Sequence, residues 1–277
     1  MTTVEPLVHT LPTSVPGVAL FSAEFESVVT RLRTQIDEMA LGEPFVTFGA
    51  PPVIGREIVE KSGYVREFPN LLGSVHNFAG TAAEWRALRS QARPGGDWHG
   101  RQEIADVVLT PAACYHVYPR LAGTRVDEPL RFGLEAYCYR HEATSEAGRL
   151  RSFRMKELVY IGSPEACQAW RDRWRERIAD WLAGLGLDVR TEVATDPFFG
   201  PGARLMKASQ VQQTLKLEFT APVAQGRWQA IASANCHKDH FGEVFGITLA
   251  GGDLAHTACV AFGLERIALA LVHVGAA

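Results

Sequence analysis

A short stretch near the C-terminus, GLERIAL at residues 263–269, carries the most information about the fold of this chain. It follows HTACVAF at residues 256–262, so that an apolar segment runs through a glycine into an apolar helix. Arg266 lies in the first turn of that helix, where free backbone N–H groups and the positive end of the helix dipole attract a phosphate group. A solvated or salt-bridged arginine fits the same pattern, so the phosphate interpretation needs support from a second segment.

The second informative segment consists of YRHE at residues 139–142 and RLRSFRMKELV at residues 149–159. Alternating apolar residues predict one strand from Phe132 to Tyr139 and another from Leu158 to Ile161. About a dozen polar and basic residues join them, which predicts a hairpin with a long loop, and loops of that length are usually functional or disordered. An ordinary basic surface hairpin is the simpler alternative.

Together the two segments resemble the catalytic domain of class II aminoacyl-tRNA synthetases. Arg140 and Glu142 follow an aromatic residue as in motif 2 of that class, and residues 263–266 match its motif 3. The resemblance is closest to the zinc-dependent archaeal seryl-type enzymes and, closer still, to their truncated relatives, the amino acid:[carrier protein] ligases. It covers roughly residues 45–275. It implies an α+β fold, with an antiparallel sheet of about six strands flanked by helices, and a homodimer.

Length and charge favour the truncated relative over a complete synthetase. The 277 residues are predicted to form one catalytic domain, 1–277, with a short helical leader at about 1–44, and this leaves no room for a tRNA-binding arm. The leader helix has Ser22 as its N-cap and Gly42 after its end. The formal net charge is −3 and no run of Lys and Arg forms a basic patch, so tRNA is not expected as a partner.

We expect a cytoplasmic protein that has no membrane partner. No segment has the composition of a secretion signal, and the longest C-terminal apolar stretch, residues 267–277, is too short to span a bilayer. The five cysteines are scattered and odd in number, which does not suggest a disulfide framework.

A second predicted helix begins at Ser163 and Pro164 and carries an apolar stripe that includes Trp170, Trp174 and Trp181. The simpler interpretation is a helix packed on the sheet. The alternative is a docking surface for a small acidic partner, because arginine and tryptophan are frequent in interfaces and residues 171–177 are rich in arginine. The leader helix is the other candidate for such a surface.

The resemblance also implies a metal site. In the zinc-dependent seryl-type enzymes the ligands are a cysteine before motif 2, a glutamate at its end and a cysteine before motif 3, and these positions match Cys114, Glu157 and Cys259. Three protein ligands and one open position are the arrangement of a catalytic zinc, and the open position would take the substrate's amine. Each cysteine alone is most simply a buried thiol. The cluster CHKDH at residues 236–240 lacks paired ligands, and we interpret it as part of a loop.

The same resemblance assigns the residues that would bind ATP and the substrate. Arg140 and Arg266 would stabilise the phosphates while a carboxylate attacks the α-phosphate, since fixed cations provide most of this stabilisation. The other roles are adenine recognition by Glu142, adenine stacking on Phe153, contacts to the outer phosphates by Arg149 or Arg151, and substrate binding by Ser233, Asn235 and Glu157.

The magnesium ligand is less well defined. Gln229 stands where the seryl-type enzymes have a metal-binding glutamate. Either Glu218 supplies the Mg²⁺ ligand or the alignment is shifted at this point. The segment DPFF at residues 196–199 also resembles a loop of the family, and no role is assigned to it.

These assignments imply an ATP-dependent ligase that activates a small amino acid, with glycine or alanine favoured, as an aminoacyl adenylate. The enzyme would then transfer it to the phosphopantetheine thiol of a carrier protein. Two alternatives stay open: a minimal synthetase-like enzyme with tRNA or another acceptor, and a catalytically silent regulatory paralogue. The intact residues Arg140, Glu142, Phe153 and Arg266 argue against a silent protein.

Overall fold

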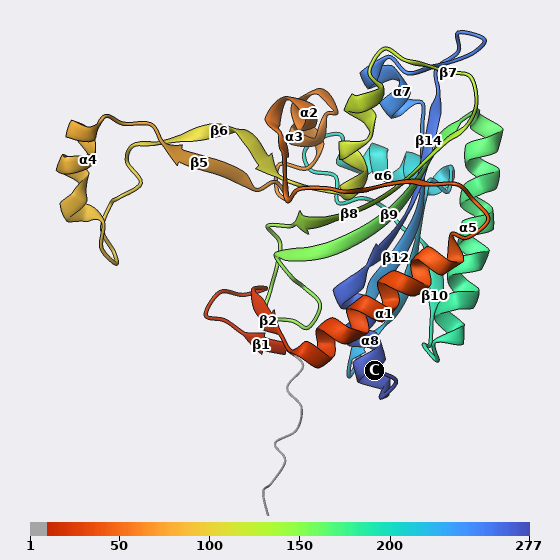
Figure 1. Ribbon diagram of the computed structural model, residues 1–277, viewed down its shortest axis with the longest axis horizontal. Coiled ribbons are helices and arrows are strands. Elements are labelled where there is room, and N and C mark those ends of the chain that lie inside the picture. Colours follow the sequence, from red (N-terminus) through yellow and green to blue (C-terminus); the bar gives the residue numbers. More distant parts are fainter. Residues whose placement is uncertain (1–9) are drawn as a thin grey trace, which may run out of the picture.

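The computed structural model describes residues 10–277, and its centre is a sheet of seven strands with helices packed against it (Figure 1). The strand order is β10-β11-β12-β14-β9-β8-β3. All neighbours in this order are antiparallel except β3 and β8, which run parallel. The expected antiparallel sheet of an α+β fold is therefore confirmed, and one parallel strand extends it at the edge.

The strands that carry the predicted site residues lie in the middle of this sheet and are the longest. The seven strands are β3 (Val46–Gly49), β8 (Leu130–Tyr139), β9 (Ser152–Gly162), β10 (Arg190–Val193), β11 (Lys216–Ala224), β12 (Arg227–Lys238) and β14 (His256–Gly263).

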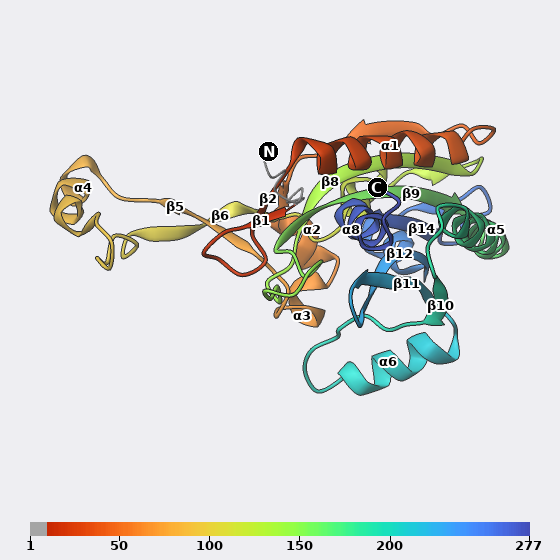
Figure 2. The same ribbon diagram turned by 90° about the horizontal axis from the view of Figure 1, so that it is seen from below.

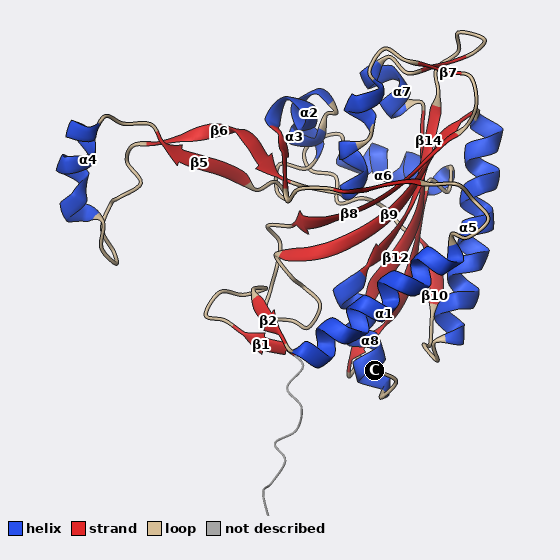
Figure 3. Ribbon diagram, viewed as in Figure 1, coloured by secondary structure: helices blue, strands red, loops and turns tan. Residues whose placement is uncertain are grey.

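Three helices cover one face of the sheet, as Figure 3 shows by colour. These are α1 (Ala23–Met39), α5 (Pro164–Gly184) and α8 (Leu264–Val274), and their apolar sides form the larger core with the sheet. As predicted, Ser22 caps α1, because its Oγ accepts a hydrogen bond of 3.2 Å from the backbone N–H of Phe25. Among residues 10–277, no helix combines the length and the apolar character needed to cross a membrane.

The opposite face is covered by shorter elements, and a second core lies beneath them. It includes two short 3₁₀ helices, η2 (Ala113–His116) and η3 (Tyr118–Leu121), and the helix α7 (His240–Phe245). Cys114 and Cys259 are both buried in this core. The sheet thus separates a structural face, under the three long helices, from the face that carries the candidate site.

An arm projects from the body of the molecule, and α4 lies at its tip (Figure 2). Its strands β5 and β6 belong to a separate three-stranded sheet with the order β4-β6-β5. The elements not yet delimited are β1 (Thr10–Pro12), β2 (Ala19–Phe21), β4 (Val53–Gly55), α2 (Arg56–Lys61), α3 (Tyr64–Glu67), β5 (Ser74–Phe78), α4 (Ala82–Leu88), η1 (Arg89–Gln91), β6 (Gln102–Leu109), β7 (Arg125–Val126), α6 (Ala203–Gln212) and β13 (Thr248–Leu249).

The predicted leader contains the hairpin of β1 and β2, followed by α1. Its first nine positions, residues 1–9, lie outside the part of the chain that is described. Helix α1 does not project as an arm but packs beside α8 on the sheet. The division of the chain into a leader of about 1–44 and a catalytic domain stays a prediction.

The tryptophans of α5 are part of the core. Trp170 and Trp174 are both 0% exposed, and the Trp170 indole N–H donates a hydrogen bond of 2.9 Å to Glu43. The docking-surface interpretation of these two residues is therefore wrong, because the apolar stripe of α5 faces the sheet. The interpretation as a packed helix is confirmed.

Strand β9 begins at Ser152, well before the predicted start at Leu158. The charged residues Arg154 and Lys156 obscured the strand pattern, since charged side chains rarely face a core. Both are nevertheless buried. Lys156 forms an ion pair with Asp37 of α1, with 2.7 Å between Nζ and Oδ1.

Arg154 joins three elements through a buried ionic network. Its Nε donates to Glu265 Oε1 at 2.6 Å and its backbone N–H to Glu265 Oε2 at 2.8 Å. The two terminal nitrogens donate to both carboxylate oxygens of Glu26, at 2.6 and 2.8 Å. The network fixes the start of α8, and with it the neighbouring Arg266, relative to β9 and α1.

The Arg154→Met substitution should lower the free energy of unfolding by about 3–5 kcal/mol, because it leaves the buried Glu265 without its partner. Urea-induced unfolding measures this change. The control is Arg56→Ala in the ion pair with Glu60, whose side chains are 38% and 52% exposed; it should cost less than about 1 kcal/mol. Equal, small losses for the two variants would contradict the structural role of the network.

Candidate active site

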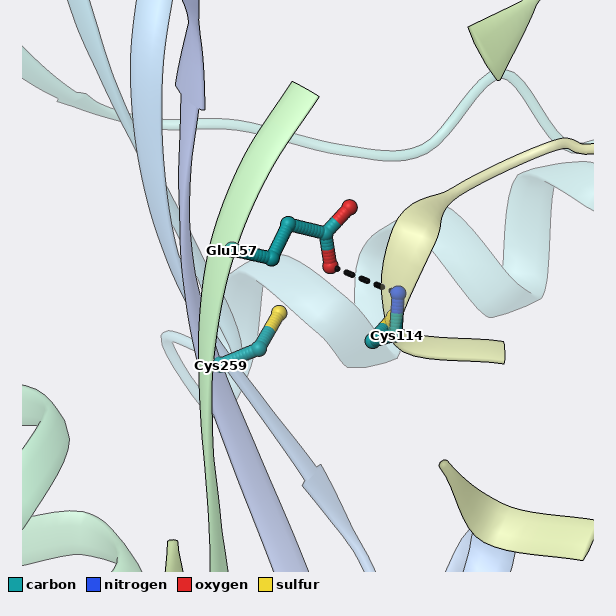
Figure 4. A group of neighbouring side chains, drawn as sticks. All are labelled: Cys114, Glu157 and Cys259. Carbon is teal, nitrogen blue, oxygen red and sulfur yellow. Dashed lines mark hydrogen bonds between the residues drawn. The ribbon is translucent and has the colours of Figure 1, made fainter. Parts of the chain in front are cut away.

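Cys114, Glu157 and Cys259 meet at one buried point, although they are far apart in the sequence (Figure 4). One possible ligand atom from each residue lies within 4.8 Å of the others. All three residues are at most 3% exposed. The structure therefore brings together the complete triad that the resemblance implied, in a geometry that could hold a metal ion.

The pairing of β9 with β14 puts two of these residues on the same face of the sheet. Glu157 lies opposite Ala261 and Cys259 lies opposite Val159, so that the two side chains are diagonal neighbours across the strands. One-residue slippage of either strand would turn its ligand to the opposite face.

Glu157 also holds Cys114 in place. Glu157 accepts hydrogen bonds from the backbone N–H of Ala113, at 2.9 Å, and of Cys114, at 3.1 Å; the latter is the dashed line in Figure 4. The carboxylate thereby fixes the turn η2, and this turn presents the Cys114 sulfur to the site. Glu157 is thus both a possible ligand and the support of another.

Burial and the closeness of the three side chains shift the pKa values of all three triad residues. Burial, together with the neighbouring Cys259, raises the pKa of Glu157 to about 7. A hydrogen bond between the sulfurs raises the pKa of Cys114 well above its usual range and lowers that of Cys259 well below it. Two sulfurs and a carboxylate oxygen are a ligand set that suits zinc, and a divalent cation would offset their combined negative charge.

Two further side chains contact the Cys259 sulfur. Asn235 Nδ2 lies 3.4 Å from Sγ and His237 Nε2 lies 3.5 Å from it. Asn235 was a predicted substrate-binding residue, and its amide also donates to the hydroxyl of Ser233 at 3.1 Å. The structure therefore groups both predicted substrate residues of β12 beside the triad.

His237 is a site residue that the sequence interpretation missed. The cluster at residues 236–240 was interpreted as a loop, but β12 continues to Lys238 and α7 starts at His240. The expected loop is wrong because the strand continues through an irregularity between Cys236 and Lys238. Ser233 and Asn235 share one face of the strand, and His237 reaches the Cys259 sulfur on that side from the irregular position.

The predicted phosphate-binding arginines are both present near the site. The Arg140 guanidinium donates to the carbonyl of Pro111 and to Tyr64 Oη, the latter at 3.4 Å. The Arg266 guanidinium donates to the carbonyl oxygens of Gly148 and Ala230, each at 2.8 Å. Burial, reinforced by the neighbouring Arg149, lowers the pKa of Arg266 to about 10.

Several predicted ATP-binding residues affect the pKa of Arg266: Arg149 and Arg140 lower it, while Glu218 and Glu142 raise it. Arg151 differs from these, because its Nε donates to Pro16 O at 3.1 Å in the leader hairpin. Its backbone N–H donates to Gly17 O at 2.8 Å. Phe153 packs, partly buried, at the edge of the second core.

Gln229 contacts the motif 2 loop. Its Nε2 donates to the carbonyl of Ala147 at 2.7 Å, and its Oε1 is buried without a hydrogen-bond partner in the described chain. A Cβ atom on Gly148 would lie 2.6 Å from that oxygen. Gly148 also has a φ of +77°, so both space and conformation require glycine here.

Glu218 and Asp196 flank the partly buried Lys216. Lys216 Nζ lies 2.7 Å from Asp196 Oδ1 and 3.1 Å from Glu218 Oε1. Gln210 of α6 holds the same aspartate through two hydrogen bonds of 2.7 Å. The segment at residues 196–199, which had no assigned role, is thereby tied to the sheet beside the site.

Comparison with known proteins agrees with this fold. Residues 101–274 match the family model of the tRNA synthetase class II core domain (G, H, P, S and T). Solved structures with the same fold include the seryl-tRNA synthetase of M. kandleri, with a TM-score of 0.81 at 20% identity, covering 95% of this chain and 55% of that one. The ATP complex of the Pyrococcus horikoshii enzyme has a TM-score of 0.69 at 16% identity and covers 94% and 54%.

Some relatives found by sequence have a higher sequence identity to this chain than these solved structures. A protein of Bradyrhizobium diazoefficiens named amino acid–[acyl-carrier-protein] ligase 1 is 44% identical over 262 residues, which are 93% of this chain and 79% of that protein. A type-2 serine–tRNA ligase of Methanothermobacter thermautotrophicus is 32% identical over 57% of this chain and 33% of its own length. The chain therefore belongs to the class II tRNA synthetase core family and, within it, to the group of the amino acid–[acyl-carrier-protein] ligases.

Proposed function

We propose that this chain uses ATP to activate a small amino acid, glycine or alanine, as an aminoacyl adenylate, and transfers it to the phosphopantetheine thiol of a carrier protein. The observation that carries the proposal is the meeting of Cys114, Glu157 and Cys259 at one buried point, with Arg140 directly after β8 and Arg266 in the first turn of α8. The name of the 44% identical Bradyrhizobium protein supports the carrier protein as acceptor.

The chemistry follows from the positions of the fixed charges. The substrate carboxylate attacks the α-phosphate of ATP, and pyrophosphate leaves. Arg140 and Arg266 offset the negative charge that develops on the phosphoryl oxygens, and they need little reorganisation because both are already held by backbone carbonyls. Glu142 and Phe153 are proposed to bind adenine, Arg149 to contact the outer phosphates, and Glu218 to hold Mg²⁺.

A zinc ion is proposed to bind Cys114, Glu157 and Cys259. Bound zinc with three protein ligands supplies one open position, which would accept the free amine of the amino acid. Asn235 contacts the Cys259 sulfur and the Ser233 hydroxyl, and both residues are proposed to contact the substrate. Binding of the amine would select an α-amino acid over an acid without an amine.

The proposal also includes the oligomeric state, the cellular location and the acceptor of the amino acid. An unpartnered edge supports a homodimer, since Val46 and Phe48 of the edge strand β3 are 55% and 38% exposed. The five cysteines are free thiols, which suits a cytoplasmic location. The formal net charge of −3 supports a protein acceptor over tRNA.

The Cys259→Ala substitution should remove the zinc, expected at one per chain, and abolish activity while the protein stays folded. Elemental analysis measures the metal, and amino-acid-dependent ATP–pyrophosphate exchange measures activation. Cys236→Ala is the control, because Cys236 is a half-buried cysteine outside the triad. Full zinc content in the Cys259→Ala protein would show that the metal lies elsewhere.

The Arg266→Met substitution should lower the exchange rate by about 10²–10³-fold, because it removes a fixed cation from the developing phosphate charge. Arg190→Ala is the control: Arg190 stacks on Trp228 at 3.8 Å on the edge strand β10, away from the triad. The wild-type protein should show exchange with glycine or alanine. No exchange with any amino acid would favour a silent regulatory protein instead.

Holo carrier protein should be aminoacylated by this enzyme with ATP and glycine or alanine, while apo carrier protein should not, because only the holo form has the phosphopantetheine thiol. Mass spectrometry of the carrier protein detects the added residue, and bulk tRNA serves as the third acceptor. Efficient charging of tRNA without any transfer to the carrier thiol would identify a minimal synthetase. Hydroxy acids and N-acylated amino acids should fail as substrates, since they lack a free amine.

A further inference from the structure

The Cys259 sulfur has two side-chain contacts besides those within the triad. Two side-chain nitrogens point at it, Asn235 Nδ2 at 3.4 Å and His237 Nε2 at 3.5 Å. Both belong to β12, which pairs directly with the strand of Cys259, and Asn235 lies opposite Cys259 in the register. The contacts are therefore built into the sheet.

The other nitrogen of His237 has a partner of its own. His237 Nδ1 lies 3.0 Å from the hydroxyl oxygen of Thr257, a residue that is 0% exposed. A thiolate that binds a metal can only accept hydrogen bonds, so Nε2 must carry the hydrogen. In the neutral imidazole Nδ1 is then an acceptor, and the Thr257 hydroxyl donates to it. The chain of donors runs from Thr257 through His237 to the Cys259 sulfur.

Aromatic rings fix the orientation of the imidazole. Phe241 meets the His237 ring edge-on at 5.1 Å between centroids, and Tyr118 does so at 6.3 Å. A ring held at both nitrogens and on its sides has little freedom to turn away. The geometry thus favours a lasting contact with the sulfur over a chance approach.

We propose that His237, oriented by Thr257, is a positioning residue that sets how strongly the Cys259 sulfur donates charge to the metal bound by the triad. This inference rests on the proposed zinc site. Two thiolates and one carboxylate together carry more negative charge than the positive charge of Zn²⁺. A hydrogen bond to one sulfur withdraws part of this negative charge from the metal. The metal then keeps more of its affinity for the amine of the substrate, and the ligand stays in its orientation.

His240 provides a matched control within the same segment. It also meets Phe241 edge-on, at 4.8 Å, but its Nε2 is paired with the carbonyl of Ser62 at 3.2 Å. His237→Phe and His240→Phe therefore remove the same type of side chain beside the same aromatic ring. Thr257→Val is the second test variant, because it keeps His237 and removes only the donor to Nδ1.

The experiment measures the metal directly. Zinc affinity is determined by competition with a chromophoric chelator, and the sulfur-to-metal charge-transfer band is recorded after substitution with Co²⁺. For His237→Phe we expect zinc binding to be about 10–100-fold weaker, because Cys259 loses a contact that holds it in its orientation. We expect the band to move to longer wavelength, because a sulfur without a hydrogen bond gives up its electrons more easily. Thr257→Val should shift the band in the same direction, by less. His240→Phe should match the wild type in both.

An unchanged band and unchanged zinc affinity in His237→Phe would overturn this inference. Weaker zinc binding without a band shift would also overturn it, because loss of packing alone lowers affinity and leaves the sulfur's electrons unaltered. Absence of zinc and cobalt binding by the wild-type chain would instead refute the proposed zinc site, and this inference with it. If His237→Phe fails to fold, Thr257→Val decides the question by its band position.

Discussion

The antiparallel pairing of β9 with β14 is the constraint on which the rest of the site depends. Its register places Glu157 and Cys259 as diagonal neighbours on one face, and it carries the chain directly into α8, where Arg266 lies. A register shift by one residue would bury the wrong side of both strands. The Arg154–Glu265 contact fixes the end of this pair, because Glu265 accepts from both the backbone and the guanidinium of Arg154. A structural ion pair thus holds the register that the functional residues require.

The sequence predicted the parts of the fold in which periodicity and burial agree. Helix α1 and strand β8 followed from apolar spacing, and the cap Ser22 followed from the preference of serine for the position before a helix. The start of β9 did not, because Arg154 and Lys156 are buried as ion pairs, and the alternation rule assumes that buried residues are apolar. The parallel edge strand β3 is only four residues long, which is too short for a periodic signal.

The metal triad shows a different limit. Cys114, Glu157 and Cys259 come from η2, β9 and β14, and no local spacing connects them. Resemblance to a family identified these three residues. It does not identify His237, and residues 236–240 lack the paired ligands that are typical of a zinc site. The strand period that places Ser233 and Asn235 does not extend to His237, because the register of β12 shifts between Cys236 and Lys238. The periodicity of a strand indicates which side chains share a face. This indication is weak where the strand is irregular or ends in a turn.

The contacts of Arg266 connect the first turn of α8 to the motif 2 loop and to β12. The guanidinium donates to the neutral carbonyls of Gly148 and Ala230, and Gln229 holds the same loop through Ala147. The two carbonyls therefore fix the orientation of the Arg266 guanidinium relative to the loop. The departure from a glutamate at position 229 has a physical reason in the same contacts, because a carboxylate could not donate to the Ala147 carbonyl that anchors the loop.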